Sequence, residues 1–145
     1  MAGTRRQART ATLQVLYELD CTKHEVEGIL TRLRAGEIFT QEALGFTEEL
    51  VQGVIRNKSD IDALIKRFAP AFPAEQMSIV DRNILRLAIF EILFNDKTPF
   101  KVAINEAVEL AKSFGSNSSP RLINGVLGSI ANRHGTKQVE PHQGA

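Results

Sequence analysis

The side chains whose types and spacing most clearly indicate a chemical role in this sequence are cationic. Arg5, Arg6 and Arg9 are the only ionisable side chains among the first ten of its 145 residues. An arginine guanidinium offers a planar set of donors that pairs with phosphate oxygens and stacks on bases. The cluster therefore favours contact with a polyanion, although three arginines alone are more often a solvated terminus.

Two further residues extend this hypothesis. Arg121 follows the polar turn Ser116–Ser119 at a predicted helix N-terminus, where free backbone N–H groups attract phosphate. Phe68 has a ring that could stack on a base, but a phenylalanine at this spacing is more often part of the core. From the residues alone, both interpretations of Phe68 stay open.

Catalytic and metal-binding patterns are not found in the sequence. It holds one cysteine and three histidines, and Cys21 and His24 lie three residues apart without a third partner. Structural zinc sites usually take four closely spaced ligands. Neither a GxxxxGK[ST] loop nor a GxGxxG loop occurs, so there is no nucleotide-binding fingerprint. We expect no metal site and favour a binding function.

The composition is that of an ordinary globular protein, with 43% hydrophobic residues, 24% charged residues and a net charge of +1. No apolar run approaches the roughly 18 residues that a membrane helix needs. No apolar signal-peptide region follows the basic start. A lone cysteine fits a reducing compartment. We expect a cytoplasmic protein that makes no contact with a membrane.

Apolar residues recur at helical spacing along nearly the whole chain, which predicts an all-α fold. The apolar stripes and turn residues predict helices over about residues 5–19, 26–35, 44–55, 59–68, 78–95, 99–114 and 120–131. The fifth is apolar on nearly every side, so we expect it at the centre of the fold. Ser59 with Asp62, and Ser78 with Asp81, have the spacing of helix-capping pairs.

Pro70 and Pro73 interrupt the helical pattern, because proline lacks the backbone N–H and clashes with the preceding turn. We therefore predict an N-terminal helical subdomain over residues 1–72 and a C-terminal helical subdomain over residues 73–133. Residues 134–145 are polar and have no apolar period. They are predicted to form a disordered tail.

Three stretches carry more specific motifs: RRQARTATLQVLY (Arg5–Tyr17), VDRNILRLAIFEIL (Val80–Leu93) and PFKVAINEAVELAKSFGSNSSPRLINGVL (Pro99–Leu127). Together they resemble the NusB family of bacterial transcription antitermination factors over about residues 4–132. The third stretch is the most specific. The resemblance implies two packed helical subdomains with about seven helices, no enzyme activity and no cofactor.

The resemblance also implies partners. Family members bind the boxA element of nascent ribosomal-operon and phage RNA together with NusE, a ribosomal small-subunit protein. The complex joins elongating RNA polymerase with NusA and NusG, and it suppresses premature termination. Matching positions imply RNA contacts from Arg5, Arg6, Arg9, Phe68, Ser118 and Arg121. Matching positions imply a NusE-facing role for Tyr17 and Asp81.

Two other interpretations follow from the same family. NusB-like helical domains also occur fused to ribosomal-RNA cytosine methyltransferases. The second interpretation is a self-associating helical module, because some family members form homodimers that could cover the RNA surface. We favour a stand-alone RNA-binding factor, because these 145 residues contain no catalytic domain and no cofactor loop.

Overall fold

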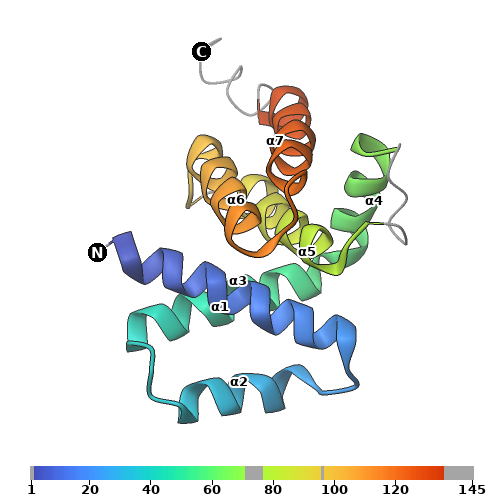
Figure 1. The fold of residues 1–145 in the computed structure, drawn as a ribbon. Coiled ribbons are helices and arrows are strands. Elements are labelled where there is room, and N and C mark those ends of the chain that lie inside the picture. The colour runs from blue at the N-terminus through green and yellow to red at the C-terminus, as the bar shows by residue number, and fades with distance from the viewer. Residues whose placement is uncertain (1, 71–76, 96, 136–145) are drawn as a thin grey trace.

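A computed structural model describes residues 2–70, 77–95 and 97–135, which form seven α-helices and no strand (Figure 1). The helices are α1 (Ala2–Cys21), α2 (Val26–Ala35), α3 (Gln41–Arg56), α4 (Lys58–Phe68), α5 (Ile79–Ile89), α6 (Phe100–Phe114) and α7 (Ser119–Ile130). Short π-helical turns continue α5 over Phe90–Phe94 and α7 over Ala131–Gly135. The predicted all-α class with seven helices is confirmed.

Helix α5 is central, as its apolar composition predicts. It packs against α1, α3, α4, α6 and α7, and its residues from Asn83 to Ile89 are all buried. A helix that is apolar on every side is shielded from water only when other helices surround it. The predicted cap is also present, because Ser78 Oγ accepts a hydrogen bond of 3.0 Å from the backbone N–H of Asp81.

Helix α4 begins differently from the prediction. Its first residue is Lys58, and Asn57 precedes it without a side-chain capping bond. Ser59 therefore lies inside the first turn, and the predicted capping pair of Ser59 and Asp62 is wrong. Asp62 instead accepts two hydrogen bonds from Arg86 of α5, at 2.8 and 3.0 Å. The Asp62 carboxylate, which its spacing to Ser59 predicts to cap a helix, instead forms a long-range ion pair with Arg86.

The helices fall on two sides of α1 and α3 in Figure 1. Helix α1 packs against α2, α3 and α5, while α4 contacts α3, α5 and α7. The predicted subdomain boundary after residue 72 lies in the stretch 71–76, outside the described residues, and it stays a prediction. Helical structure continues to Gly135, two residues into the predicted tail, and residues 136–145 lie outside the described ranges.

Gly53 allows the closest approach between α3 and the π-helical turn after α5. A Cβ atom at Gly53 would overlap the ring of Phe90, which is 4% exposed. Replacing Gly53 with alanine should therefore lower the free energy of unfolding by roughly 1–3 kcal/mol through overpacking. Urea denaturation measures this loss.

Gly45 provides the control for this prediction, because a Cβ atom there meets nothing within 4 Å in the same helix. Gly45→Ala should stabilise the protein by about 0.5–1 kcal/mol, because alanine lowers the conformational entropy of the unfolded chain. Equal effects of the two substitutions would show that the Phe90 ring does not restrict Gly53.

Candidate nucleic-acid interface

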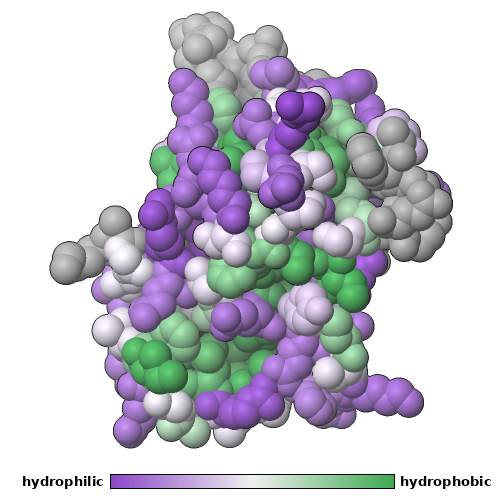
Figure 2. All heavy atoms as spheres, in the orientation of Figure 1, coloured by the Kyte–Doolittle hydropathy of each residue, from purple (hydrophilic) through white to green (hydrophobic). Residues whose placement is uncertain are grey.

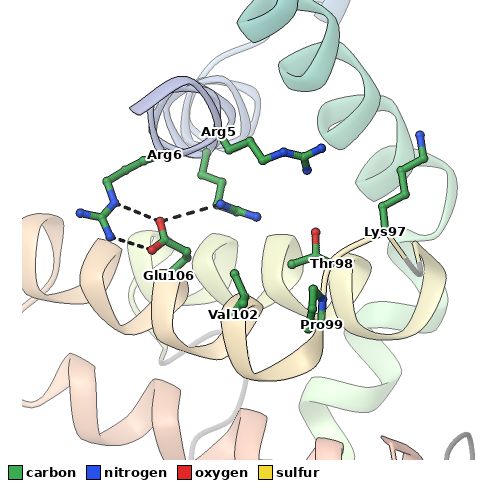
Figure 3. A pocket seen from close by; sticks show the side chains of 8 residues that line it. Arg5, Arg6, Lys97, Thr98, Pro99, Val102 and Glu106 are labelled. Carbon is green, nitrogen blue, oxygen red and sulfur yellow. Dashed lines mark hydrogen bonds and ion pairs between the residues drawn. The ribbon is translucent and has the colours of Figure 1, made fainter. Parts of the chain in front are cut away.

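A hollow of about 300 Å³ opens between the start of α1 and the segment that leads into α6 (Figure 3). It is lined by Arg5, Arg6, Arg9, Lys97, Thr98, Pro99, Val102 and Glu106. Four of these eight residues are cationic and one is acidic, while Pro99 and Val102 supply apolar surface. A cationic hollow with an apolar patch has the chemistry to hold a phosphate-bearing chain.

Arg5 is exposed and stands over the ring of Phe46 on α3, with its Cζ atom 4.5 Å from the ring centroid. An aromatic face attracts a guanidinium without cancelling its charge. Arg5 makes no ion pair within the described part of the chain. Its positive charge is therefore available at the rim of the hollow.

Arg6 is exposed but paired. It donates two hydrogen bonds to Glu106 of α6, from Nε to Oε1 at 3.1 Å and from Nη2 to Oε2 at 2.7 Å. The Arg6 hydrogen bonds hold the pKa of the Glu106 carboxyl below its usual range, and the same contact raises the pKa of Arg6. Glu106 is thus ionised at neutral pH. An incoming phosphate must compete with Glu106 for Arg6.

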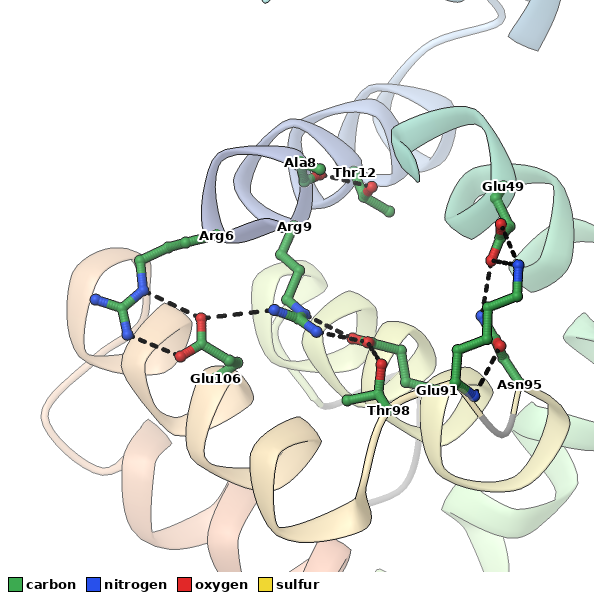
Figure 4. A network of polar contacts seen from close by, with 10 residues as sticks. Arg6, Ala8, Arg9, Thr12, Glu49, Glu91, Asn95, Thr98 and Glu106 are labelled. Carbon is green, nitrogen blue, oxygen red and sulfur yellow. Dashed lines mark hydrogen bonds and ion pairs between the residues drawn. The ribbon is translucent and has the colours of Figure 1, made fainter. Parts of the chain in front are cut away.

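Arg9 lies in a different environment from its two neighbours (Figure 4). Its side chain is 5% exposed, and its Nε and Nη2 atoms each donate a hydrogen bond of 2.9 Å to Glu91. Its Nη1 atom lies 3.8 Å from Oε1 of Glu106. A buried guanidinium held by carboxylates is not open to a phosphate. The implied contact between Arg9 and the RNA backbone therefore does not fit the structure, which gives Arg9 a structural role.

Lys97 is the cation that sequence reasoning missed. It is exposed on the opposite wall from Arg5, where its Nζ donates to both carboxylate oxygens of Glu49 on α3, at 3.0 and 3.3 Å (Figure 3). Asn95 fixes the turn, because its Oδ1 accepts a hydrogen bond from the backbone N–H of Lys97. The single signal in the sequence is its position two residues before Pro99, which directly precedes α6.

Ser118 and Arg121 lie away from this hollow. Both are exposed at the start of α7, beyond the C-terminal end of α6. Because α6 has 15 residues and the hollow lies at its start, the two places are roughly 20 Å apart. A ligand that contacts both must run along α6.

Phe68 is not part of the hollow either. It is the last residue of α4, it is half-buried and it packs against the main core. The Cζ atom of Arg67 lies 5.5 Å from its ring centroid. Figure 1 separates α4 from the N-terminal end of α1. The structure therefore favours the core interpretation of Phe68 and does not bring it to Arg5 and Arg6.

Tyr17 lines a second hollow, of about 500 Å³, together with Leu13, Val80 and Phe114 among others. Tyr17 is 43% exposed and Phe114 is 44% exposed, and Figure 2 shows hydrophobic surface beside α1 on this face. Exposed aromatic rings around an apolar hollow are typical of a protein-binding surface. Asp81 is only 7% exposed, so its carboxylate is largely withdrawn from that surface.

The other polar clusters give no metal site. No three His, Cys, Asp or Glu side chains in the described ranges lie close enough to hold a metal ion. His24 pairs through Nδ1 with Glu18 at 2.7 Å instead of with Cys21. Among the described helices none has the length and hydropathy of a membrane span.

Comparison with known proteins decides the family. The model of the NusB family matches residues 6–132. The chain belongs to the NusB family. Transcription antitermination protein NusB of Dehalococcoides mccartyi strain CBDB1 is 52% identical over 131 residues, which cover 90% of this chain and 92% of that protein. The NusB protein of Herpetosiphon aurantiacus is 46% identical over 136 residues, which cover 92% and 93% of the two chains.

Solved structures of NusB proteins share the fold. T. maritima NusB superposes with a TM-score of 0.81 at 35% identity, covering 88% of this chain and 90% of that one. A crystal structure of antitermination factors NusB and NusE in complex with dsRNA superposes with a TM-score of 0.82 at 24% identity, covering 92% and 99%. NusB family members are transcription antitermination factors and not enzymes. The hollow beside α1 is therefore a candidate binding site.

Proposed function

We propose that this NusB family member binds boxA RNA together with NusE in the cytoplasm and suppresses premature termination in ribosomal RNA operons. The observation that carries the proposal is the cationic hollow, where Arg5, Arg6 and Lys97 surround the apolar patch of Pro99 and Val102. A structural relative crystallised with NusE and dsRNA supports both partners. NusA, NusG and RNA polymerase complete the assembly.

In this proposal, phosphates of single-stranded RNA lie against Arg5 and Arg6. These contacts supply most of the affinity and its dependence on salt. Unpaired bases, read at their edges, supply the sequence preference. A strand that continues along α6 reaches Ser118 and Arg121, where the backbone N–H groups at the start of α7 favour a phosphate.

The hollow around Tyr17 is the proposed surface for NusE. Phe114 lines this hollow and also a smaller one that includes Arg6 and Glu106. The proposed surfaces for the protein partner and for the RNA therefore adjoin at Phe114. Joint contact of this kind makes the second binding step intramolecular, so the pair should bind RNA more tightly than either protein alone.

Fluorescence anisotropy with a labelled boxA oligonucleotide tests the proposed function. With NusE present, boxA should bind more tightly than a shuffled oligonucleotide of the same composition. Without NusE, the preference should persist with a lower affinity. Equal affinities for the two oligonucleotides in the presence of NusE would refute the proposal.

Glu106 gives a further prediction, because it competes with phosphate for Arg6. Glu106→Gln should strengthen boxA binding by roughly two- to fivefold, the equivalent of one exposed ion pair. The measurement is the same anisotropy titration at low salt. Weaker binding would mean that Glu106 orients Arg6 for the RNA and does not compete with it.

A further inference from the structure

We infer that Glu91 is a positioning residue for the RNA site: it fixes the two walls of the cationic hollow relative to each other. Glu91 lies in the π-helical turn Phe90–Phe94 that ends α5. The inference rests on the proposed RNA-binding function, and it concerns a buried carboxylate that lies behind the surface that the RNA contacts.

The carboxylate of Glu91 joins both walls directly (Figure 4). It accepts hydrogen bonds from Nε and Nη2 of Arg9 on α1, both at 2.9 Å, and from Oγ1 of Thr98 at 3.1 Å. Glu91 is 1% exposed. Because a buried charge without its partners is strongly unfavourable, this arrangement tolerates little movement of either wall.

Each partner of Glu91 is next to residues that face the hollow. Thr98 lies between Lys97 and Pro99, which line one wall. On the other wall, Arg9 follows Arg5 and Arg6 by four and three residues along α1. Residues at these spacings share one face of a helix. Anchoring Arg9 therefore sets the rotation of α1 that presents Arg5 and Arg6 at the rim.

The π-helical turn is held from the opposite side as well. Phe90, the neighbour of Glu91, packs so closely on Gly53 of α3 that no Cβ atom fits between them. Two adjacent residues of this turn thus contact different helices: Phe90 packs on α3, and Glu91 binds Arg9 of α1. Turns of this kind are rare and frequently occur at functional sites. The backbone that carries Glu91 is therefore fixed before the RNA binds.

A purely electrostatic role and a positioning role of Glu91 predict opposite changes in boxA affinity when its carboxylate is removed. By charge alone, loss of a negative group near a polyanion site strengthens binding. If Glu91 positions the walls, Glu91→Gln weakens boxA binding by about tenfold, because a site loosened by its supporting residues loses its contacts. The dependence of log affinity on log salt should also become shallower, because fewer phosphates are neutralised.

Two variants accompany this test. Glu48→Gln removes an equal charge from α3 on the side that faces α2, where Glu48 pairs with Arg34, and should leave binding unchanged. Thr98→Val removes one hydrogen bond to Glu91 without changing charge or shape. It should weaken binding by about two- to fivefold, in the same direction as Glu91→Gln. It also serves as the test if Glu91→Gln does not fold.

Hydrogen exchange separates this inference from the proposed function. In Glu91→Gln, amides of residues 5–9 should exchange faster, while amides around Tyr17 keep the exchange rates of the original protein. Unchanged exchange at residues 5–9, or boxA binding as tight as that of the original protein in both Glu91→Gln and Thr98→Val, overturns the inference. If the unaltered protein shows no preference for boxA, the proposed function fails, and faster exchange at residues 5–9 still establishes the anchoring by Glu91.

Discussion

Replacing Arg5 and Arg6 together with alanine is expected to weaken boxA binding by roughly ten- to a hundredfold at low salt, because two charge-assisted phosphate contacts are lost. The salt dependence gives the sharper signal. Each phosphate contact with a single strand contributes about 0.7 to the slope of log affinity against log salt, so the slope should fall by about 1.4. Anisotropy titrations across a range of salt concentrations measure both quantities.

The matched control removes two cations elsewhere. Arg56 and Lys58 are exposed at the junction of α3 and α4, which Figure 1 separates from the N-terminal end of α1. Arg56→Ala with Lys58→Ala changes the net charge equally. This control should leave the slope unchanged. Equal losses in the two double variants would show that binding follows overall charge and not the hollow.

Replacing Arg86 with methionine is expected to have the largest effect on stability. Arg86 is 7% exposed and joins three helices, with ion pairs of 2.8 Å to Asp20 on α1 and to Asp62 on α4. Removing one partner of a buried pair typically costs roughly 3–5 kcal/mol. We expect a loss near the lower end of this range, because Asp20 keeps its ion pair with Arg82 and the side chain of Asp62 is 38% exposed. Urea denaturation should show this loss, while the folded variant keeps its RNA affinity.

The same cluster predicts the response to acid. Burial alone would raise the pKa of Asp20, but hydrogen bonds from Asn83 and Arg82 and the charges of Arg86 and Arg82 lower it overall. A folded-state pKa below the ordinary value of 3.8 means that Asp20 stabilises the fold fully above that value. This contribution is lost as the pH falls through the folded-state pKa. The thermal midpoint should therefore fall below about pH 4, and less steeply in Arg86→Met.

A surface pair provides the comparison for Arg86. The side chain of Arg32 is 63% exposed and pairs with Glu18. Exposed ion pairs contribute little, so Arg32→Met should leave the urea midpoint nearly unchanged. If Arg32→Met and Arg86→Met were equally destabilising, the burial of Arg86 would not be the cause of its effect.

The helices could be predicted from the sequence because their apolar spacing is local information. The central place of α5 follows from its composition, and the Ser78 cap follows from its spacing to Asp81. The fate of Asp62 could not be predicted in this way. A capping pair and an ion pair with a residue 24 positions away compete for the same carboxylate, and only the packing of α4 on α5 decides between them.

The candidate site was predictable in part for the same reason. A run of arginines marks the start of α1, but nothing in the run distinguishes the buried Arg9 from the exposed Arg5 and Arg6. The carboxylate that pairs with buried Arg9 is Glu91, 82 residues away in the otherwise apolar turn Phe90–Phe94. Lys97 is far from the arginine run in sequence and reaches the hollow only because the segment before α6 lies beside the start of α1.

The position of the bound strand tests the central claim most directly. A boxA oligonucleotide that carries photoreactive uridines can be cross-linked to the protein in the presence of NusE, and the attached peptides can be identified by mass spectrometry. We expect cross-links at the first turns of α1 and in residues 97–102. Cross-links confined to α2 or α4, with none on either wall of the hollow, would contradict the account.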